Sequence, residues 1–200
     1  APENMAMVRH IILNMLQKIK EILPSHSLIS KNLSELFVVD YTHINGGKVL
    51  LLDSKPEESC VYIENKNKVS VYFDGFEHNA LEISTGLYSK QCECIMFPEE
   101  EIENRWILFI ETKYVDNIEN AFRDNNDYPN CMITQIIETV NYFRNKGIIE
   151  QNKRVNAIVS FPTLIEDFSS TFFTGNMSIE DLLIDYKIKI YDSFTPHLTK

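Results

Sequence analysis

Two neighbouring apolar segments, each of strand length and each carrying a carboxylate, most constrain how this chain folds. The first, Cys92–Phe97, contains Glu93, and the second, Trp106–Ile110, runs directly into Glu111. Short apolar runs of this length are typical of buried strands, and a carboxylate buried there costs free energy unless it has a partner. The sequence therefore predicts two buried strands with charged groups that need a counter-charge or a function.

The connection between these strands predicts how they pair. Residues 98–105 are polar and strongly acidic, which suits a solvated turn between antiparallel strands. Strand side chains alternate between faces, so Glu111 and Lys113 project from one face, and Glu93 lies beside Glu111 if the register allows it. Two adjacent carboxylates repel each other unless a cation lies between them, and oxygen ligands suit Mg²⁺ or Mn²⁺. A lysine two residues further on is placed to orient a water molecule or to stabilise developing negative charge.

The remaining periodicities predict the elements around these strands. Apolar residues recur at helical spacing before Pro24, and helix-stop signals follow a second periodic segment, while several short β-branched runs flank turn residues. The predicted elements are an amphipathic helix over 8–23, a hairpin of strands 37–39 and 49–52, a second hairpin of strands 61–63 and 69–73, a helix over 131–146, a strand over 155–161 and an edge strand over 186–191.

From Glu93 onward the predicted order is strand, strand, helix, strand, which is the order of a mixed sheet with a crossover helix. The predicted fold class is therefore α/β in the mixed α+β sense, with a central mixed β-sheet flanked by helices, an extra N-terminal helix and β-hairpins. With 200 residues of which 44% are hydrophobic, the chain is expected to form one domain over residues 1–200.

Composition limits the environment and the partners. No apolar run reaches the length of a membrane span and no signal-peptide core is present, so the expected location is cytoplasmic, without a membrane partner. The four cysteines form no dense framework, and Cys92 and Cys94 are expected to be buried free thiols. The five histidines, His26 among them, match no nucleophile motif, so surface or capping roles are expected.

A formal net charge of −10 disfavours broad nonspecific nucleic-acid binding, because phosphate backbones attract Lys and Arg. Binding of nucleic acid then requires a local basic strip. The residues available for one, provided that they cluster, are Lys146, Lys153, Arg154, Lys187 and Lys189.

The residues around the two strands resemble a known family pattern. Glu93, then Glu111-Thr112-Lys113 at the end of an apolar strand, then Gln135 on the following helix, are similar to the core of the PD-(D/E)XK nuclease superfamily, which has a restriction-endonuclease-like fold. The resemblance covers roughly residues 81–161. Two features depart from the pattern, because Glu93 stands where Asp is usual and no Pro-Asp pair precedes it.

The resemblance implies Mg²⁺-dependent hydrolysis of phosphodiester bonds, with Mn²⁺ as an alternative ion. It implies that Glu93 and Glu111 are metal ligands, with the Thr112 carbonyl as a further ligand, that Lys113 acts on the attacking water, and that Gln135 supports the site from the helix. An acidic residue elsewhere often completes such sites, and the candidates in this chain are Glu21, Glu35 and Glu82.

Each feature also has a plain structural interpretation. The triplet Glu64-Asn65-Lys66 has the same spacing as Glu111-Thr112-Lys113 but falls in a predicted turn, where it is expected to be solvated. Glu111 and Lys113 are equally explained as an ion pair at the exposed end of a strand. Gln135 is equally explained by a hydrogen bond at the flank of its helix.

Three functional interpretations stay open at this level. The first is a metal-dependent endo- or exonuclease, a hydrolase that cleaves DNA. The second is a catalytically inactive nuclease-fold protein that serves as a binding or regulatory module with a protein partner, which suits the acidic charge. The third is an unrelated α+β domain. Binding of a divalent metal discriminates the first two, and carboxylates of Glu93 and Glu111 on opposite faces of the sheet would support the third.

Overall fold

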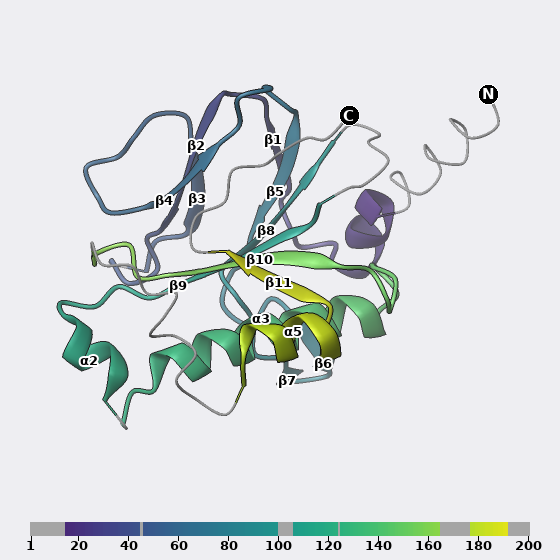
Figure 1. The fold of residues 1–200 in the computed structure, drawn as a ribbon. Helices are drawn as coiled ribbons and strands as arrows, with labels where there is room; N and C mark the ends of the chain where they lie inside the picture. The colour runs from purple at the N-terminus through teal and green to yellow at the C-terminus, as the bar shows by residue number, and fades with distance from the viewer. Residues whose placement is uncertain (1–14, 45, 100–105, 124, 165–176, 192–200) are drawn as a thin grey trace.

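A mixed β-sheet with helices on one face and a smaller sheet on the other forms the centre of the molecule (Figure 1). The computed structural model describes residues 15–44, 46–99, 106–123, 125–164 and 177–191. Within these ranges, six strands form the large sheet in the order β1 (Ile29–Lys31), β5 (Val71–Gly75), β8 (Cys94–Pro98), β9 (Leu108–Thr112), β10 (Val155–Ser160) and β11 (Ile188–Tyr191). The first four strands pair antiparallel, whereas β9, β10 and β11 run parallel.

The parallel step from β9 to β10 is made by helices, as such a crossover requires. Helix α2 (Ile118–Phe122) leads into α3 (Tyr128–Asn145), which packs on one face of the sheet. The predicted helix over 131–146 is confirmed, but it begins earlier, because Pro129 is tolerated in a first helical turn. Gly147 follows the helix with a φ of 67°, the left-handed conformation that commonly ends helices.

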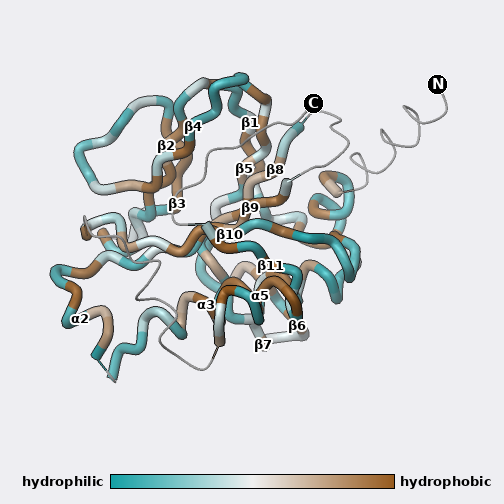
Figure 2. Tube along the Cα trace, in the orientation of Figure 1, coloured by the Kyte–Doolittle hydropathy of each residue, from teal (hydrophilic) through white to brown (hydrophobic). Residues whose placement is uncertain are grey.

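A three-stranded antiparallel sheet, in the order β3 (Val49–Leu52), β2 (Glu35–Asp40) and β4 (Val61–Glu64), covers the opposite face of the large sheet. The predicted hairpin of strands 37–39 and 49–52 is confirmed, since β2 and β3 pair directly. Alternate residues of both sheets meet in a common apolar core, and Figure 2 shows hydrophobic residues along β2, β3 and β9.

The second predicted hairpin, of strands 61–63 and 69–73, is wrong. β4 pairs with β2 in the small sheet, whereas β5 pairs with β1 and β8 in the large sheet. The side chain of Asn65 accepts a hydrogen bond from the Val69 N–H at 3.0 Å and donates to the Val69 carbonyl at 2.8 Å, and Lys68 has a φ of 49°. This turn carries the chain from one sheet to the other instead of folding it back on itself.

The remaining elements complete the helical face. The predicted helix over 8–23 is observed over 15–22, where Ile19 is buried in the core cluster to which α3 also contributes, and residues 8–14 lie outside the described residues. The predicted edge strand is β11, which follows helix α5 (Ile179–Asp185). A small hairpin of β6 (Glu82–Ser84) and β7 (Leu87–Tyr88) precedes β8. In the part of the chain that the structure describes, every helix is too short or too polar to cross a bilayer.

The expectation of a surface or capping role was wrong for His26. Its ring Nδ1 lies 2.6 Å from Asp74 Oδ2, with only 4% and 1% of the two side chains exposed, and its Nε2 lies 3.3 Å from the Ala80 carbonyl. The partners are 48 and 54 residues away in sequence, so no local pattern points to them. His26 is part of a buried ion pair that fixes the chain after β5.

Candidate active site

The pairing of β8 with β9 places Glu93 beside Glu111. Cys94 lies opposite Ile110, and the Glu93 N–H donates a hydrogen bond to the Ile110 carbonyl at 3.0 Å, so the next residue of β9 is Glu111. Phe109, two residues before Glu111, packs edge-on against Phe143 of α3 at 5.7 Å between ring centroids. Because side chains alternate along a strand, Glu111 projects from this same helix-covered face.

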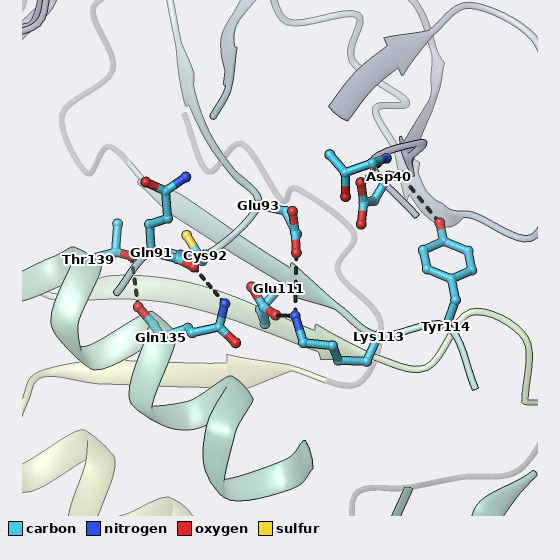
Figure 3. Close-up of polar contacts among 10 residues, drawn as sticks. Asp40, Gln91, Cys92, Glu93, Glu111, Lys113, Tyr114, Gln135 and Thr139 are labelled. Atoms are coloured by element: carbon cyan, nitrogen blue, oxygen red, sulfur yellow. Dashed lines mark hydrogen bonds and ion pairs between the residues drawn. The ribbon is translucent and has the colours of Figure 1, made fainter. Parts of the chain in front are cut away.

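Lys113 joins the two carboxylates, as Figure 3 shows. Its Nζ donates to Glu111 Oε1 at 2.5 Å and lies 3.5 Å from Glu93 Oε1. The three side chains become steadily more buried toward the sheet, with exposed fractions of 27% for Lys113, 15% for Glu93 and 0% for Glu111. The structure thus brings together three of the residues identified from sequence, and they are not a solvated ion pair.

Burial and mutual repulsion alter the protonation of the site. Desolvation, together with the charge of Asp40, raises the pKa of Glu93 to about 7 despite the opposing effect of Lys113. Desolvation and the neighbouring Glu93 raise the pKa of Glu111 well above its usual value. Burial lowers the pKa of Lys113, but the two carboxylates outweigh it and the pKa is raised. One ammonium group therefore does not compensate for all the negative charge gathered here.

One atom at the centre of the site has no partner. Glu111 Oε2 is buried and accepts no hydrogen bond from any of the described residues, while Oε1 of the same carboxylate receives the one from Lys113. Buried polar groups in native proteins are nearly always paired, so an exception calls for an explanation such as a bound ion. Unpaired carboxylate oxygen is the type of ligand that Mg²⁺ and Mn²⁺ prefer.

Asp40, the last residue of β2, is an acidic residue of the site that the sequence analysis missed. It is 6% exposed, and Figure 3 shows its carboxylate on the side of Glu93 away from Glu111. One of its oxygens, Oδ1, accepts a hydrogen bond from the Thr42 N–H at 2.7 Å. The missed signal was local, because Asp40 ends an apolar strand in the same way as Glu111. Its position beside Glu93 depends on how the small sheet packs on the large one.

Gln135 supports the site through the backbone. Its side-chain amide donates to the Gln91 carbonyl at 2.7 Å. One turn later on α3, Thr139 Oγ1 accepts a hydrogen bond from the Cys92 N–H at 2.8 Å. These two bonds fix the backbone immediately before Glu93, so α3 positions the carboxylate without a direct hydrogen bond from Gln135 to it.

Cys92 and Cys94 flank Glu93 as buried free thiols, as expected. Desolvation, with a contribution from the charge of Glu111, raises the pKa of Cys92, and desolvation raises that of Cys94 as well. Both side chains are therefore neutral packing groups within the apolar core on either side of Glu93 in the sequence.

The other acidic candidates lie apart from the site. Glu21 accepts a hydrogen bond from Gln17 on an exposed helix surface, Glu35 opens β2 at the end opposite Asp40, and Glu82 accepts one from the Gly86 N–H. In the triplet with the same spacing only Lys66 is solvated as predicted: it is 72% exposed and pairs with Glu64 at 2.9 Å, whereas Glu64 ends β4 with 29% of its side chain exposed and Asn65 is buried.

The basic residues considered as a nucleic-acid strip gather at the far end of the sheet. Val155, which starts β10, donates its N–H to the Lys187 carbonyl, and Arg144 donates to the Lys153 carbonyl. Glu111 pairs instead with Val159, near the end of β10. Four residues of strand separate the two positions, roughly 13 Å at about 3.3 Å per residue. The set near the start of β10 comprises Lys146, Lys153, Arg154, Lys187 and Lys189.

Two carboxylates and one carbonyl are the donor set available for a metal. Thr112, whose carbonyl was expected to be a further ligand, is buried at the end of β9 between Glu111 and Lys113. Among the described residues, no group of three or more His, Cys, Asp or Glu side chains is arranged to hold a metal ion. Mg²⁺ commonly binds through only one or two carboxylates and keeps several waters, so the pair of Glu93 and Glu111 fits it.

Comparison of the chain with protein-family models, with curated proteins and with solved structures finds no match. The geometry of the site is therefore the basis for its interpretation.

Proposed function

We propose that this protein is a metal-dependent nuclease of the PD-(D/E)XK type, which hydrolyses phosphodiester bonds of DNA. The observation that carries the proposal is the convergence of Glu93, Glu111 and Lys113 at one point, where Glu111 Oε2 is buried without a partner. A structural ion pair needs one carboxylate and one lysine, whereas this site holds an excess of buried negative charge. Such an excess is typical of a site that binds a cation.

The order of elements supports a restriction-endonuclease-like core over residues 81–161. Strands β8 and β9 form an antiparallel pair, α3 crosses over, and β10 returns parallel to β9. Glu111 lies on β9 and Glu93 directly precedes β8, and α3 covers the face from which Glu111 projects. Fold alone does not determine chemistry, so the proposal rests on the site and not on the topology.

Glu93 and Glu111, with the Thr112 carbonyl, would hold Mg²⁺ or Mn²⁺. The ion would neutralise charge on the phosphate and lower the pKa of a bound water. Lys113 lies at the more exposed side of the pair, where its ammonium group can orient an attacking water and stabilise negative charge that develops on the phosphate. Asp40 adds negative charge beside Glu93, and Gln135 keeps the backbone before Glu93 in place.

A cleavage assay tests this function. The protein is incubated with plasmid and with single-stranded DNA in Mg²⁺ or Mn²⁺, and in EDTA. We expect metal-dependent cleavage that Lys113→Ala reduces by at least about a hundredfold, because general-acid or base and electrostatic groups contribute 10²–10⁴. The matched control is Lys66→Ala, which removes the solvated lysine of the triplet with the same spacing and should leave the rate unchanged. Equal cleavage by the Lys113→Ala protein would identify a contaminating nuclease.

The alternative function, a catalytically inactive module that binds a protein partner, is favoured by a different observation. Lys113 pairs with both carboxylates and so supplies the only positive charge bridging them in the described structure. With a net charge of −10 and the basic residues at the other end of β10, an acidic surface suits a protein partner. Under this alternative no divalent cation binds and no DNA is cleaved.

A further inference from the structure

Two aromatic rings stack at the rim of the site, and the proposed nuclease chemistry does not use them. His43, in the turn after β2, lies against Tyr114, which follows Lys113 directly. Their ring centroids are 4.0 Å apart and their planes are inclined by only 19°. His43 is exposed and Tyr114 is partly buried. One face of the imidazole therefore rests on the tyrosine, and its other face is available to a planar ligand.

The lower ring of the stack is held firmly. Tyr114 Oη donates a hydrogen bond to the Ser59 carbonyl at 3.1 Å and accepts one from the Asp40 N–H at 3.3 Å. The two bonds connect the end of β9 to β2 and to the loop before β4. A ring held in this way loses little conformational entropy when a ligand stacks on its partner.

The stack is linked to the reacting groups by two short connections. Tyr114 is the residue after Lys113, and it contacts the backbone of Asp40, whose carboxylate lies beside Glu93 (Figure 3). A ligand base on His43 would therefore bring the phosphate of an adjacent nucleotide into the neighbourhood of Lys113. The small sheet, which supplies His43 and Asp40, is then the wall of the site on the substrate side.

We propose that His43, supported by Tyr114, is a stacking platform for an unpaired nucleobase, so that the protein binds single-stranded DNA. The proposal names the substrate of the proposed nuclease. Cleavage of the bound strand rests on that proposed function, whereas binding of the strand does not. Bases of a duplex are stacked on one another and do not offer a free face, whereas a single strand does. Stacking also explains how so acidic a chain binds nucleic acid. Near this wall Lys31 and Lys48 pair with Asp53 and Glu77, so they offer the phosphate backbone little net charge.

Binding without turnover tests the platform. The probe is a fluorescently labelled oligothymidylate of about ten nucleotides, within the site size of single-strand binding proteins. Anisotropy is measured at pH 8 in EDTA, beside the same strand with abasic sites and beside a blunt duplex of equal length. We expect the single strand to bind more tightly than both comparison probes. We expect His43→Ala to weaken its binding about 5- to 150-fold, since one base–aromatic stack contributes 1–3 kcal/mol.

Two variants complete the test. His43→Phe keeps an aromatic face without a titrating group and should retain binding, which separates stacking from a charge contact with phosphate. His78→Ala replaces another exposed histidine, in the loop after β5, and should bind like the unmodified protein.

The platform is overturned if the His43→Ala protein binds the single strand as tightly as the unmodified protein does, or if the abasic strand binds as tightly as the intact one. Tighter binding of the duplex than of the single strand, or no binding of any oligonucleotide, also overturns it. If binding does not depend on His43 but metal-dependent cleavage is observed, the platform is contradicted and the proposed nuclease function is retained. Binding that depends on His43, without any cleavage, supports the platform and contradicts the nuclease.

Discussion

Two buried clusters of charge in this protein differ in how completely they are neutralised. In the first, His26 and Asp74 form a pair with exposed fractions of 4% and 1%, and both ring nitrogens face an acceptor, one on Asp74 and one on the Ala80 carbonyl. In the second, Glu93 and Glu111 share the single ammonium group of Lys113. The first cluster matches one cation to one anion, and the second does not.

The comparison separates a structural use of buried charge from a functional one. The His26 imidazolium donates one N–H to Asp74 and the other to the Ala80 carbonyl, so its hydrogen-bonding groups are all paired. A pair of this kind holds distant segments of the chain together. The second cluster leaves Glu111 Oε2 without a hydrogen bond and raises the pKa of both carboxylates. Such an arrangement costs stability, and a site that exists to bind a ligand explains the cost. Active sites often cost stability for this reason.

Breaking the matched pair should have the largest effect. Asp74→Asn leaves the buried imidazolium without its counter-ion, so we expect the free energy of unfolding at pH 6 to fall by about 3–5 kcal/mol. Urea titration followed by circular dichroism measures it. The control is Asp53→Asn, which removes the 55% exposed partner of Lys31 and should cost less than about 1 kcal/mol. A small loss for Asp74→Asn would mean that the pair is not a structural one.

Neutralising the unmatched cluster should have the opposite sign. The pKa of Glu93 is raised from 4.5 to about 7, so its ionised form is disfavoured in the folded protein. We expect Glu93→Gln to raise the free energy of unfolding at pH 8 by about 2 kcal/mol, somewhat below the full shift at 1.36 kcal/mol per pKa unit. Near pH 5, where the folded protein already carries a protonated Glu93, most of the gain should disappear. Destabilisation at pH 8 would show that Glu93 is held by a structural ion pair.

The matched pair should also give a pH dependence with a defined direction. Burial alone would lower the pKa of His26, but the hydrogen bond and charge of Asp74 outweigh it, and the pKa is raised above 6.5. The stability that the pair contributes is therefore complete below pH 6.5 and is lost as the pH rises through the folded pKa. Because one proton is involved, the slope is at most about 1.4 kcal/mol per pH unit.

His26→Gln should flatten this part of the stability profile, while the part due to Glu93 remains. Chemical unfolding at pH values from 5 to 9 measures both. An unchanged slope in the His26→Gln protein would contradict the assignment of a charged imidazole.

The smallest expected effect concerns the support of the unmatched cluster. Gln135→Leu removes the hydrogen bond to the Gln91 carbonyl, and we expect a loss of about 1 kcal/mol of stability. If the nuclease function holds, cleavage should fall by more than this loss explains, because the backbone before Glu93 is less well fixed. Glu138→Leu, on the same helix, is the matched control. Equal effects of both changes on cleavage would remove Gln135 from the site.

The local patterns of the sequence predicted most of the central fold. The helical period before Gly147, the short acidic connection after β8 and the alternation that ends at Lys113 are properties of neighbouring residues, so the antiparallel pairing of the two strands followed from them. The placement of Glu93 beside Glu111 depended in addition on the register, which local patterns do not set. The hairpin at Asn65 was predicted wrongly, because a turn that leads from one sheet to another can have the same residue types as a hairpin turn. The side-chain hydrogen bonds of Asn65 that direct the chain are not visible in the sequence pattern.

What the sequence did not predict depends on packing between distant segments. Asp40 reaches the site only because the small sheet lies on the large one, and His26 meets Asp74 across 48 residues. Asp40 carries a local signal, since it ends an apolar strand, but that signal does not show which residues of the large sheet it meets, and His26 carries no local signal of its partner. The platform of His43 and Tyr114 joins residues from two sheets for the same reason.

Calorimetric titration of the protein with Mn²⁺ at pH 8 tests the central claim, that the unmatched cluster is a cation site. We expect binding at one site, its loss in Glu111→Gln, and its retention in Glu64→Gln, which changes the partly exposed glutamate of the other triplet. Because Glu93 must lose its proton, affinity should fall as the pH is lowered through about 7. Absence of Mn²⁺ binding to the unmodified protein, or equal binding by the Glu111→Gln protein, would contradict the account.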